Sequence, residues 1–323
     1  MSSFRRFAPI SAQRSIPSGP KLSGTKSWLY GQSLISTGCK DLDTALGSGI
    51  PLGSIVVLSE ELFCSQMRTF EKLFVSEGIR SKQRVLIISS LPKDEVDDFL
   101  TKMPALKEVP EPTKKEAPKS AFRSLESSSL QPILPKYANA VDSVEFCHGF
   151  DLSKWEQDMS LFSSVVIVHV DNDPAFFVKK VISAVHSFVS LCSKESVVGR
   201  IILDVAEILG QDERLQMELF SRLPSLLRSS NCVLLTLLLG ELNGMKALRF
   251  ANCIVHLQPW QDITPPTEYR DTTSLLHVLR LPSQLSLYTN PKNIFIYGIK
   301  RTTHSLRLSE LRIPPQGHSL ELF

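Results

Sequence analysis

The sequence predicts an α/β fold, a mostly parallel sheet with helices on both faces and an antiparallel extension at its C-terminal end. Three observations support this. The 323 residues are 42% hydrophobic and 21% charged, a mix typical of a globular protein. Strand-like and helix-like patterns alternate through the middle of the chain, and the final third holds only short extended runs. Such alternation is typical of a parallel sheet covered on both sides.

The N-terminus is basic and rich in proline. Residues 1–40 contain six basic side chains and no acidic one. Pro9, Pro17 and Pro20 disfavour the amphipathic helix of a mitochondrial presequence. We therefore expect residues 1–25 to form a flexible basic tail before a single domain over 26–323, with contact to phosphates as the alternative.

The first strand, helix and strand follow in close order. Residues 54–58 (SIVVL) and 84–89 (RVLIIS) are β-branched and apolar, which predicts two buried strands. Between them, residues 67–77 place apolar side chains at helical spacing. The chain therefore begins with a β-α-β unit.

A long irregular segment interrupts the pattern. Residues 101–142 contain six prolines and a run of three serines. Proline removes amide donors, and the few apolar side chains cannot offset the entropy lost on ordering. We expect a disordered insertion here.

The β-α alternation then resumes. An aspartate and a proline at 173 and 174 predict the start of a helix that continues to 189. Residues 200–205 and 231–239 predict strands, and 212–229 a helix kinked or broken at Pro224. Short extended runs at 253–258, 274–281, 293–300 and 305–313 predict the antiparallel extension.

Glycines cluster directly before the first strand. Residues 36–43 (STGCKDLD) are followed by LGSGIPLGS over 46–54. Glycine adopts turn conformations that are closed to other residues, so this segment delivers the chain through tight turns into a buried strand. The segment is similar to the one that precedes the phosphate-loop strand in RecA-like and KaiC-like ATPase domains, and the resemblance implies a RecA-like fold.

The phosphate loop itself is degenerate. An active loop follows the pattern G-x-x-x-x-G-K-[ST], whose amides and lysine cradle phosphates while the hydroxyl holds magnesium. Here Glu60 and Ser65 stand at the two glycines, Gln66 at the lysine and Met67 at the hydroxyl. Glu60 and Glu61 together would repel a polyphosphate. We expect no nucleotide binding of the usual kind, and no cofactor.

With the proline-rich insertion after the second strand, these features make the chain similar to the PAXNEB family, which supplies the fourth Elongator subunit. The resemblance covers residues 26–315 in order and is strongest over 36–79. It implies a non-catalytic RecA-like subunit that forms a heterohexameric ring with Elongator subunits five and six. It further implies tRNA binding, support of wobble-uridine modification by the catalytic subunit elsewhere in the complex, and ATP hydrolysis only by the assembled ring. Separately, six cysteines with no close pair indicate reduced thiols, so we expect a cytoplasmic and nuclear location.

Two further positions are candidates by resemblance. Asp204 ends a predicted strand, where an active ATPase places the aspartate that polarises magnesium; the alternative is an ordinary strand-end carboxylate. The loop after residue 239 carries Lys246 and Arg249. Corresponding loops of RecA-like rings face nucleic acid, so we expect tRNA contact there, with two solvated surface cations as the alternative.

Other functional classes fit the sequence less well. An active RecA-like or KaiC-like ATPase, or a DNA-repair paralogue, would need the missing lysine and hydroxyl, and a stand-alone scaffold would make no use of tRNA. The histidines show no metal-ligand spacing, so no metal is expected. The longest apolar run, residues 232–239, is too short to span a bilayer, so no membrane partner is expected.

Overall fold

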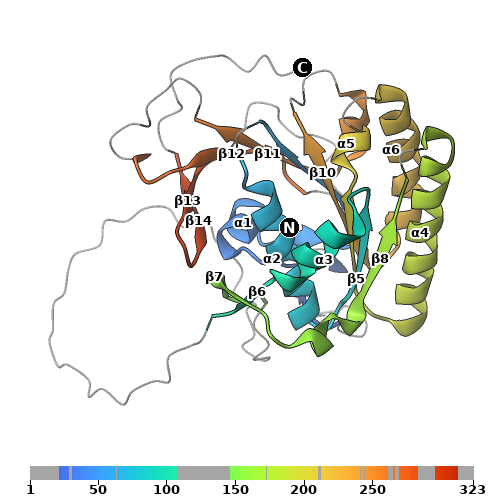
Figure 1. Ribbon diagram of the computed structural model, residues 1–323, viewed down its shortest axis with the longest axis horizontal. Coiled ribbons are helices and arrows are strands. Elements are labelled where there is room, and N and C mark those ends of the chain that lie inside the picture. Colours follow the sequence, from blue (N-terminus) through green and yellow to red (C-terminus); the bar gives the residue numbers. More distant parts are fainter. Residues whose placement is uncertain are drawn as a thin grey trace, which may run out of the picture.

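The computed structural model describes residues 22–28, 31–62, 64–107, 146–171, 173–209, 212–240, 242, 245–260, 265, 269–282 and 295–311 (Figure 1). Positions 1–21 of the predicted tail lie outside these residues. Strand β1 (Thr25–Ser27) already includes Thr25, so the folded part begins slightly before residue 26.

A nine-stranded sheet organises the fold (Figure 1). Its spatial order is β14 (Leu306–Glu310), β13 (Phe295–Arg301), β12 (Ser274–Arg280), β11 (Cys253–Pro259), β4 (Ile55–Glu60), β10 (Cys232–Leu239), β9 (Gly199–Asp204), β5 (Arg84–Ser89) and β8 (Val165–His169). The strands from β11 to β8 are parallel, and β12, β13 and β14 are antiparallel. This confirms the predicted mostly parallel sheet with an antiparallel extension. One detail differs: β11 runs parallel to β4, so the antiparallel extension begins at β12 rather than at residue 253.

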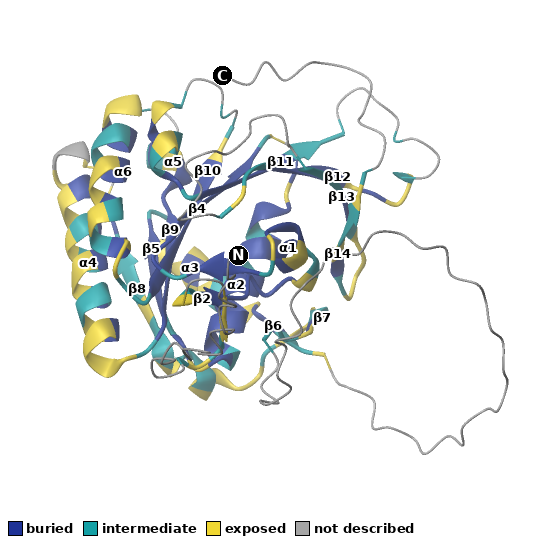
Figure 2. Ribbon diagram, turned by 180° about the vertical axis from the view of Figure 1, so that it is seen from behind, coloured by how far each residue is buried: buried dark blue, intermediate teal, exposed yellow. Residues whose placement is uncertain are grey.

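Helices cover both faces of this sheet (Figure 1). On one face lie α1 (Lys40–Ala45), α2 (Met67–Arg80) and α3 (Lys93–Thr101), and on the other α4 (Pro174–Glu195), α5 (Ala206–Leu209) and α6 (Glu213–Leu227). Alternate residues of β4 enter separate cores: Val56 and Leu58 pack on the α2 side, and Ile55 and Val57 on the α4 side. The central strands are therefore buried along almost their whole length (Figure 2), which explains their largely apolar sequences.

The longest helix, α4, is strongly apolar. By length and composition its residues Phe176–Glu195, with a mean hydropathy of 1.3, could cross a membrane. Val181, Val185 and Cys192 are fully buried against the sheet, but only 33% of this stretch is buried, so packing accounts for part of its apolar composition. The absence of a membrane partner stays a prediction.

Helix α6 is continuous through Pro224, so of the two predicted alternatives the break is wrong and the kink stays a prediction. Asp212 accepts hydrogen bonds from the amides of Arg214 and Leu215, which caps the helix start. A fully buried stripe of Leu219, Leu223 and Leu227 anchors it to the sheet. Each buried leucine contributes about 1.5–3 kcal/mol, enough to offset the one backbone hydrogen bond that proline removes.

Two small sheets flank the main one. The first joins β1 to β2 (Ser33–Ile35) and β3 (Ile50–Pro51), and the second pairs β6 (Pro104–Leu106) with β7 (Phe150–Trp155). Because α3 extends to Thr101 and β6 follows it, the irregular segment starts later than residue 101. Proline is tolerated at the first position of such an edge strand. Residues 108–145, which hold the remainder of the predicted insertion, lie outside the described residues. Two 3₁₀ helices, η2 (Met159–Ser164) and η3 (Lys246–Phe250), complete the described elements.

The glycine-rich segment before β4 has a structural explanation. Gly47, Gly49 and Gly53 have φ angles of 83°, 123° and 79°, as expected for turns that need glycine. A side chain at Gly53 would lie 2.8 Å from the Arg228 carbonyl oxygen. Asp43 ties the preceding loop together by accepting hydrogen bonds from the Thr37 amide and hydroxyl, both at 2.7 Å.

Candidate functional site

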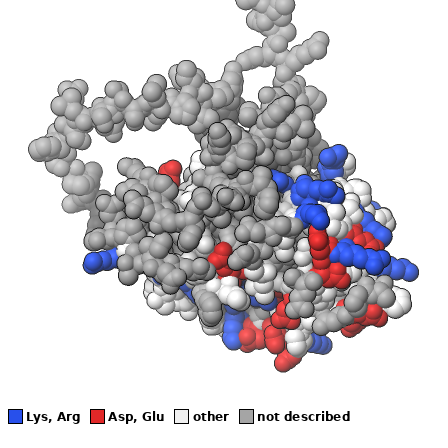
Figure 3. Space-filling view, turned by 90° about the horizontal axis from the view of Figure 1, so that it is seen from above, with Lys and Arg blue, Asp and Glu red and all other residues white. Residues whose placement is uncertain are grey.

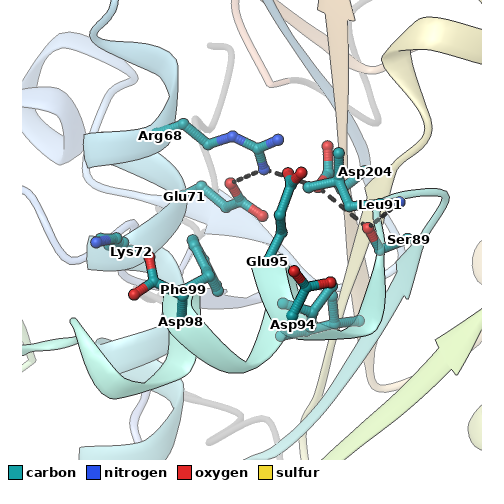
Figure 4. Close-up of a pocket in the computed structure, with 12 residues that line it drawn as sticks. Arg68, Glu71, Lys72, Ser89, Leu91, Asp94, Glu95, Asp98, Phe99 and Asp204 are labelled. Atoms are coloured by element: carbon teal, nitrogen blue, oxygen red, sulfur yellow. Dashed lines mark hydrogen bonds and ion pairs between the residues drawn. The ribbon is translucent and has the colours of Figure 1, made fainter.

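The candidate site lies at the carboxyl ends of β4, β5 and β9, beside the first turn of α2 (Figure 4). Open α/β sheets bind ligands at this edge, because loops and helix N-termini converge there. The degenerate phosphate loop forms the connection from β4 to α2. By comparison with an active loop, the site has two halves. The phosphate half is where a phosphate would bind, and the cation half is where its cation would bind.

Glu60 occupies the phosphate half. Its Oε1 atom accepts hydrogen bonds from the backbone amides of Gln66, at 2.5 Å, and Met67, at 2.8 Å. The first amides of a helix have no partner within the helix and favour an anion, so this carboxylate satisfies them as a bound phosphate would. Glu60 is 7% exposed. The chain therefore places its own anion in the phosphate position.

Glu61 points to a different partner. Its Oε1 atom lies 3.0 Å from Nε2 of His256 on β11. Repulsion of a polyphosphate by Glu60 and Glu61 stays a prediction. Both acids have partners within the chain, and Glu60 excludes a phosphate by occupying its position.

The remaining residues of the loop face solvent, contact other parts of the chain or lie in the core. Ser65, at the second glycine position, is exposed and adopts a φ of 42°, a left-handed conformation that favours glycine. The side-chain oxygen of Gln66 lies 3.5 Å from Nη1 of Arg301, and Met67 is buried in the core. Burial raises the pKa of the Cys64 thiol to about 12, with Glu60 adding to the effect, so this cysteine is a poor nucleophile.

Arg68 occupies the cation half. Its Nη1 atom lies 2.7 Å from Asp204 Oδ2 and 2.8 Å from Glu71 Oε2 (Figure 4). The Asp204 side chain is 7% exposed and that of Glu71 1%, whereas Arg68 is 42% exposed. Asp204 also accepts a hydrogen bond from the Ser89 hydroxyl. The aspartate that would polarise magnesium in an active ATPase is thus held by an internal guanidinium.

The cation half carries more negative than positive charge. The pKa of Glu71 is raised to about 7, first by burial and then by nearby Asp204, against the lowering effect of Arg68. A cavity of about 470 Å³ opens beside the pair, and Asp94, Glu95 and Asp98 of α3 line it together with Lys72 (Figure 4). Perturbed acids that line a cleft are typical of functional sites and also of structural ion pairs.

The candidate tRNA residues lie on a different element. Lys246 and Arg249 belong to η3, which follows β10. Lys246 Nζ lies 3.1 Å from Glu213 Oε1, and the Arg249 guanidinium lies 4.8 Å from the centroid of the Phe250 ring. On the face drawn in Figure 3, basic and acidic side chains are intermixed.

The structure brings together Glu60, Gln66 and Met67 at the first turn of α2, as the motif predicts, and leaves Ser65 exposed. Arg68, Glu71 and His256 are absent from the predicted site residues. A signal for the first two exists in the sequence, because Arg68 directly follows the degenerate motif and Glu71 lies three residues further, on the same helix face. Only the pairing of β4 with β11 brings His256 to Glu61.

Fold and site together define a mostly parallel α/β domain in which the chain's own side chains fill the predicted nucleotide cradle, the phosphate half and the cation half taken together. Over residues 18–321 the chain matches the family model described as PAXNEB protein, and it belongs to that family.

The curated relatives carry one name. The chain is 29% identical over 146 residues to Elongator complex protein 4 of Xenopus laevis, covering 42% of this chain and 35% of that protein. It is 31% identical over 167 residues to the Homo sapiens protein, covering 48% of this chain and 38% of that one. The chain therefore spans less than two fifths of the length of these relatives. Among solved structures it is similar to a KaiC-like protein from Pyrococcus horikoshii, with a TM-score of 0.49, 10% identity and coverage of 85% of this chain and 98% of that one.

Proposed function

We propose that this chain is a non-catalytic subunit of the Elongator complex. The observation that carries the proposal is the closed cradle, in which Glu60 occupies the phosphate position and Arg68 pairs with Asp204. A domain that fills its own nucleotide site has docking to partners as its remaining role. Membership of the PAXNEB family and similarity to proteins named Elongator complex protein 4 support the choice of complex.

In this proposal the chain forms a heterohexameric ring with Elongator subunits five and six, in the cytoplasm and the nucleus. The ring binds tRNA and supports modification of wobble uridines by the catalytic subunit of the complex. Lys246 and Arg249 are the proposed tRNA contacts. The ion pair of Lys246 with Glu213 does not remove it from this role, since the two side chains are 72% and 57% exposed and such surface pairs contribute little.

Co-expression tests the ring. The chain is produced together with Elongator subunits five and six, and the mass of the purified material is measured by light scattering. We expect one assembly with two copies of each subunit. A monomer that elutes apart from the other two subunits would contradict the proposal.

The tRNA contact is tested in that ring. The double variant Lys246→Glu, Arg249→Glu should weaken tRNA binding by about tenfold at 0.1 M salt and reduce the salt dependence, because fewer counterions are released. Lys179→Glu, Lys194→Glu on α4 is the matched control, with the same change in charge on exposed positions. Equal affinities of the ring with and without the η3 changes, at two salt concentrations, would remove η3 from the tRNA surface.

A further inference from the structure

Two imidazoles lie where the antiparallel extension joins the parallel core. His256 on β11 and His277 on β12 are directly opposite each other in the strand register, and their ring centroids are 6.1 Å apart. Among the described strands, β12 to β14 connect to the sheet only through β11 (Figure 1). The pairing of these two strands is therefore the sheet connection that holds the extension.

The two histidines differ in their partners. His256 uses both ring nitrogens: Nε2 lies 3.0 Å from Glu61 Oε1 and Nδ1 lies 3.3 Å from Ser59 Oγ. His277 is 3% exposed, and within the described part of the chain neither of its ring nitrogens has a hydrogen-bond partner. A neutral imidazole tolerates such a site better than an imidazolium does, because a buried charge without a partner loses its hydration.

Among the residues that the structure describes, the groups that face His277 offer no compensating negative charge. Opposite it on β13 lies Ile296, and on β11 lies His256, whose own charge would repel a second one. On β12 itself, Arg280 donates to the backbone carbonyls of Leu248 and Ala251, at 2.9 and 2.7 Å. The Glu61 carboxylate is engaged by Nε2 of His256, and no carboxylate among the described residues is hydrogen-bonded to His277.

We propose that the His256–His277 pair is an acid-sensitive joint, in which protonation of His277 opens the pairing between β11 and β12. Burial, with the neighbouring His256 adding to it, lowers the pKa of His277 from 6.5 to about 4. Opened strands take up a proton near pH 6.5 that the closed joint does not take up until about pH 4. The stability of the joint is therefore complete above pH 6.5 and is lost as the pH falls toward 4. By this linkage, opening is about tenfold more populated at pH 5.5 than at pH 8.

Hydrogen exchange measured by mass spectrometry on the full chain tests the joint. Exchange at pH 8 and pH 5.5 is corrected for the intrinsic rates, and peptides from β12 are compared with peptides from β9. We expect about tenfold greater opening of β12 at pH 5.5 and a smaller change in β9. His277→Phe keeps a ring of similar size without a titrating group and should abolish the pH effect, while the exposed control His186→Asn should retain it.

Two results would overturn the joint: opening of β12 that does not change with pH in the wild-type chain, or an equal pH effect in the His277→Phe variant. A second measurement covers the case in which that variant does not fold. In the wild-type chain, the imidazole carbon signals followed by NMR should show His277 still neutral at pH 5.5. A charged His277 at that pH in the closed form would equally overturn the proposal.

Discussion

The two halves of the cradle are closed in different ways. On the phosphate half, one carboxylate, Glu60, meets two neutral backbone amides. On the cation half, one guanidinium, Arg68, meets two buried carboxylates, Glu71 and Asp204. The first arrangement satisfies donors that every helix start leaves open. The second keeps a surplus of negative charge and a cavity beside it. The cation half should therefore respond more strongly to mutation and to pH.

The largest effect is expected from removing the shared cation. Arg68→Ala leaves Glu71 and Asp204 buried without the guanidinium that pairs with both. The loss should destabilise the fold by about 3–4 kcal/mol at pH 8, toward the lower end for a broken buried pair because Arg68 is partly exposed. Urea denaturation measures this. Arg222→Ala is the control, since its pair with Glu218 is 54% and 41% exposed and should contribute less than about 1 kcal/mol. Equal losses in both variants would mean that Arg68 makes only a surface contact.

The next effect is a dependence on pH. The folded state holds a proton on Glu71 up to about pH 7, whereas the unfolded chain releases it near 4.5. Stability should therefore fall by about 3 kcal/mol as the pH rises through this window. Glu71→Gln should remove that fall, and Glu207→Gln, at an exposed position, should keep it. Denaturation measured between pH 4 and 8 compares the stability of the three chains. His277 contributes an opposite dependence on pH, but this contribution is the same in all three. Parallel curves for the wild type and Glu71→Gln would contradict the assignment.

The smallest effect concerns the phosphate half. Glu60→Ala leaves two helix-start amides without an acceptor and should cost about 2 kcal/mol, whereas Glu60→Gln keeps an oxygen there and should cost less. Inorganic phosphate should then raise the melting temperature of Glu60→Ala and leave the wild type unchanged, because the vacated amides form an anion site. A phosphate response of equal size in the wild-type chain would show that Glu60 does not block the position.

Much of the fold is predictable because its signals are local. Residues 84–89 form β5 with the predicted bounds, and α2 starts at Met67 as its apolar spacing indicates. The predicted break at Pro224 is wrong because sequence reasoning sees only the local cost of the missing backbone hydrogen bond. The burial that outweighs this cost depends on the sheet beneath α6. Strand β8 is missing from the predicted elements although its sequence, VVIVH, carries a strand signal.

The site is predictable only in part. The motif identifies Glu60, Gln66 and Met67 as replacements, but it shows only which chemical groups are lost and not what the new side chains contact. The hydrogen bonds of Glu60 depend on the path of the loop that returns to α2, and the pairing of Arg68 with Asp204 joins positions 136 residues apart. Such contacts leave no periodic pattern in the sequence.

By itself, the sequence determined that this chain is a mostly parallel α/β domain and that its phosphate loop has lost the lysine and the hydroxyl. The tertiary structure decided that the cradle is occupied. Residue identities show which groups are available, whereas an ion pair or a capped helix exists only where the order of strands brings those groups within hydrogen-bond distance.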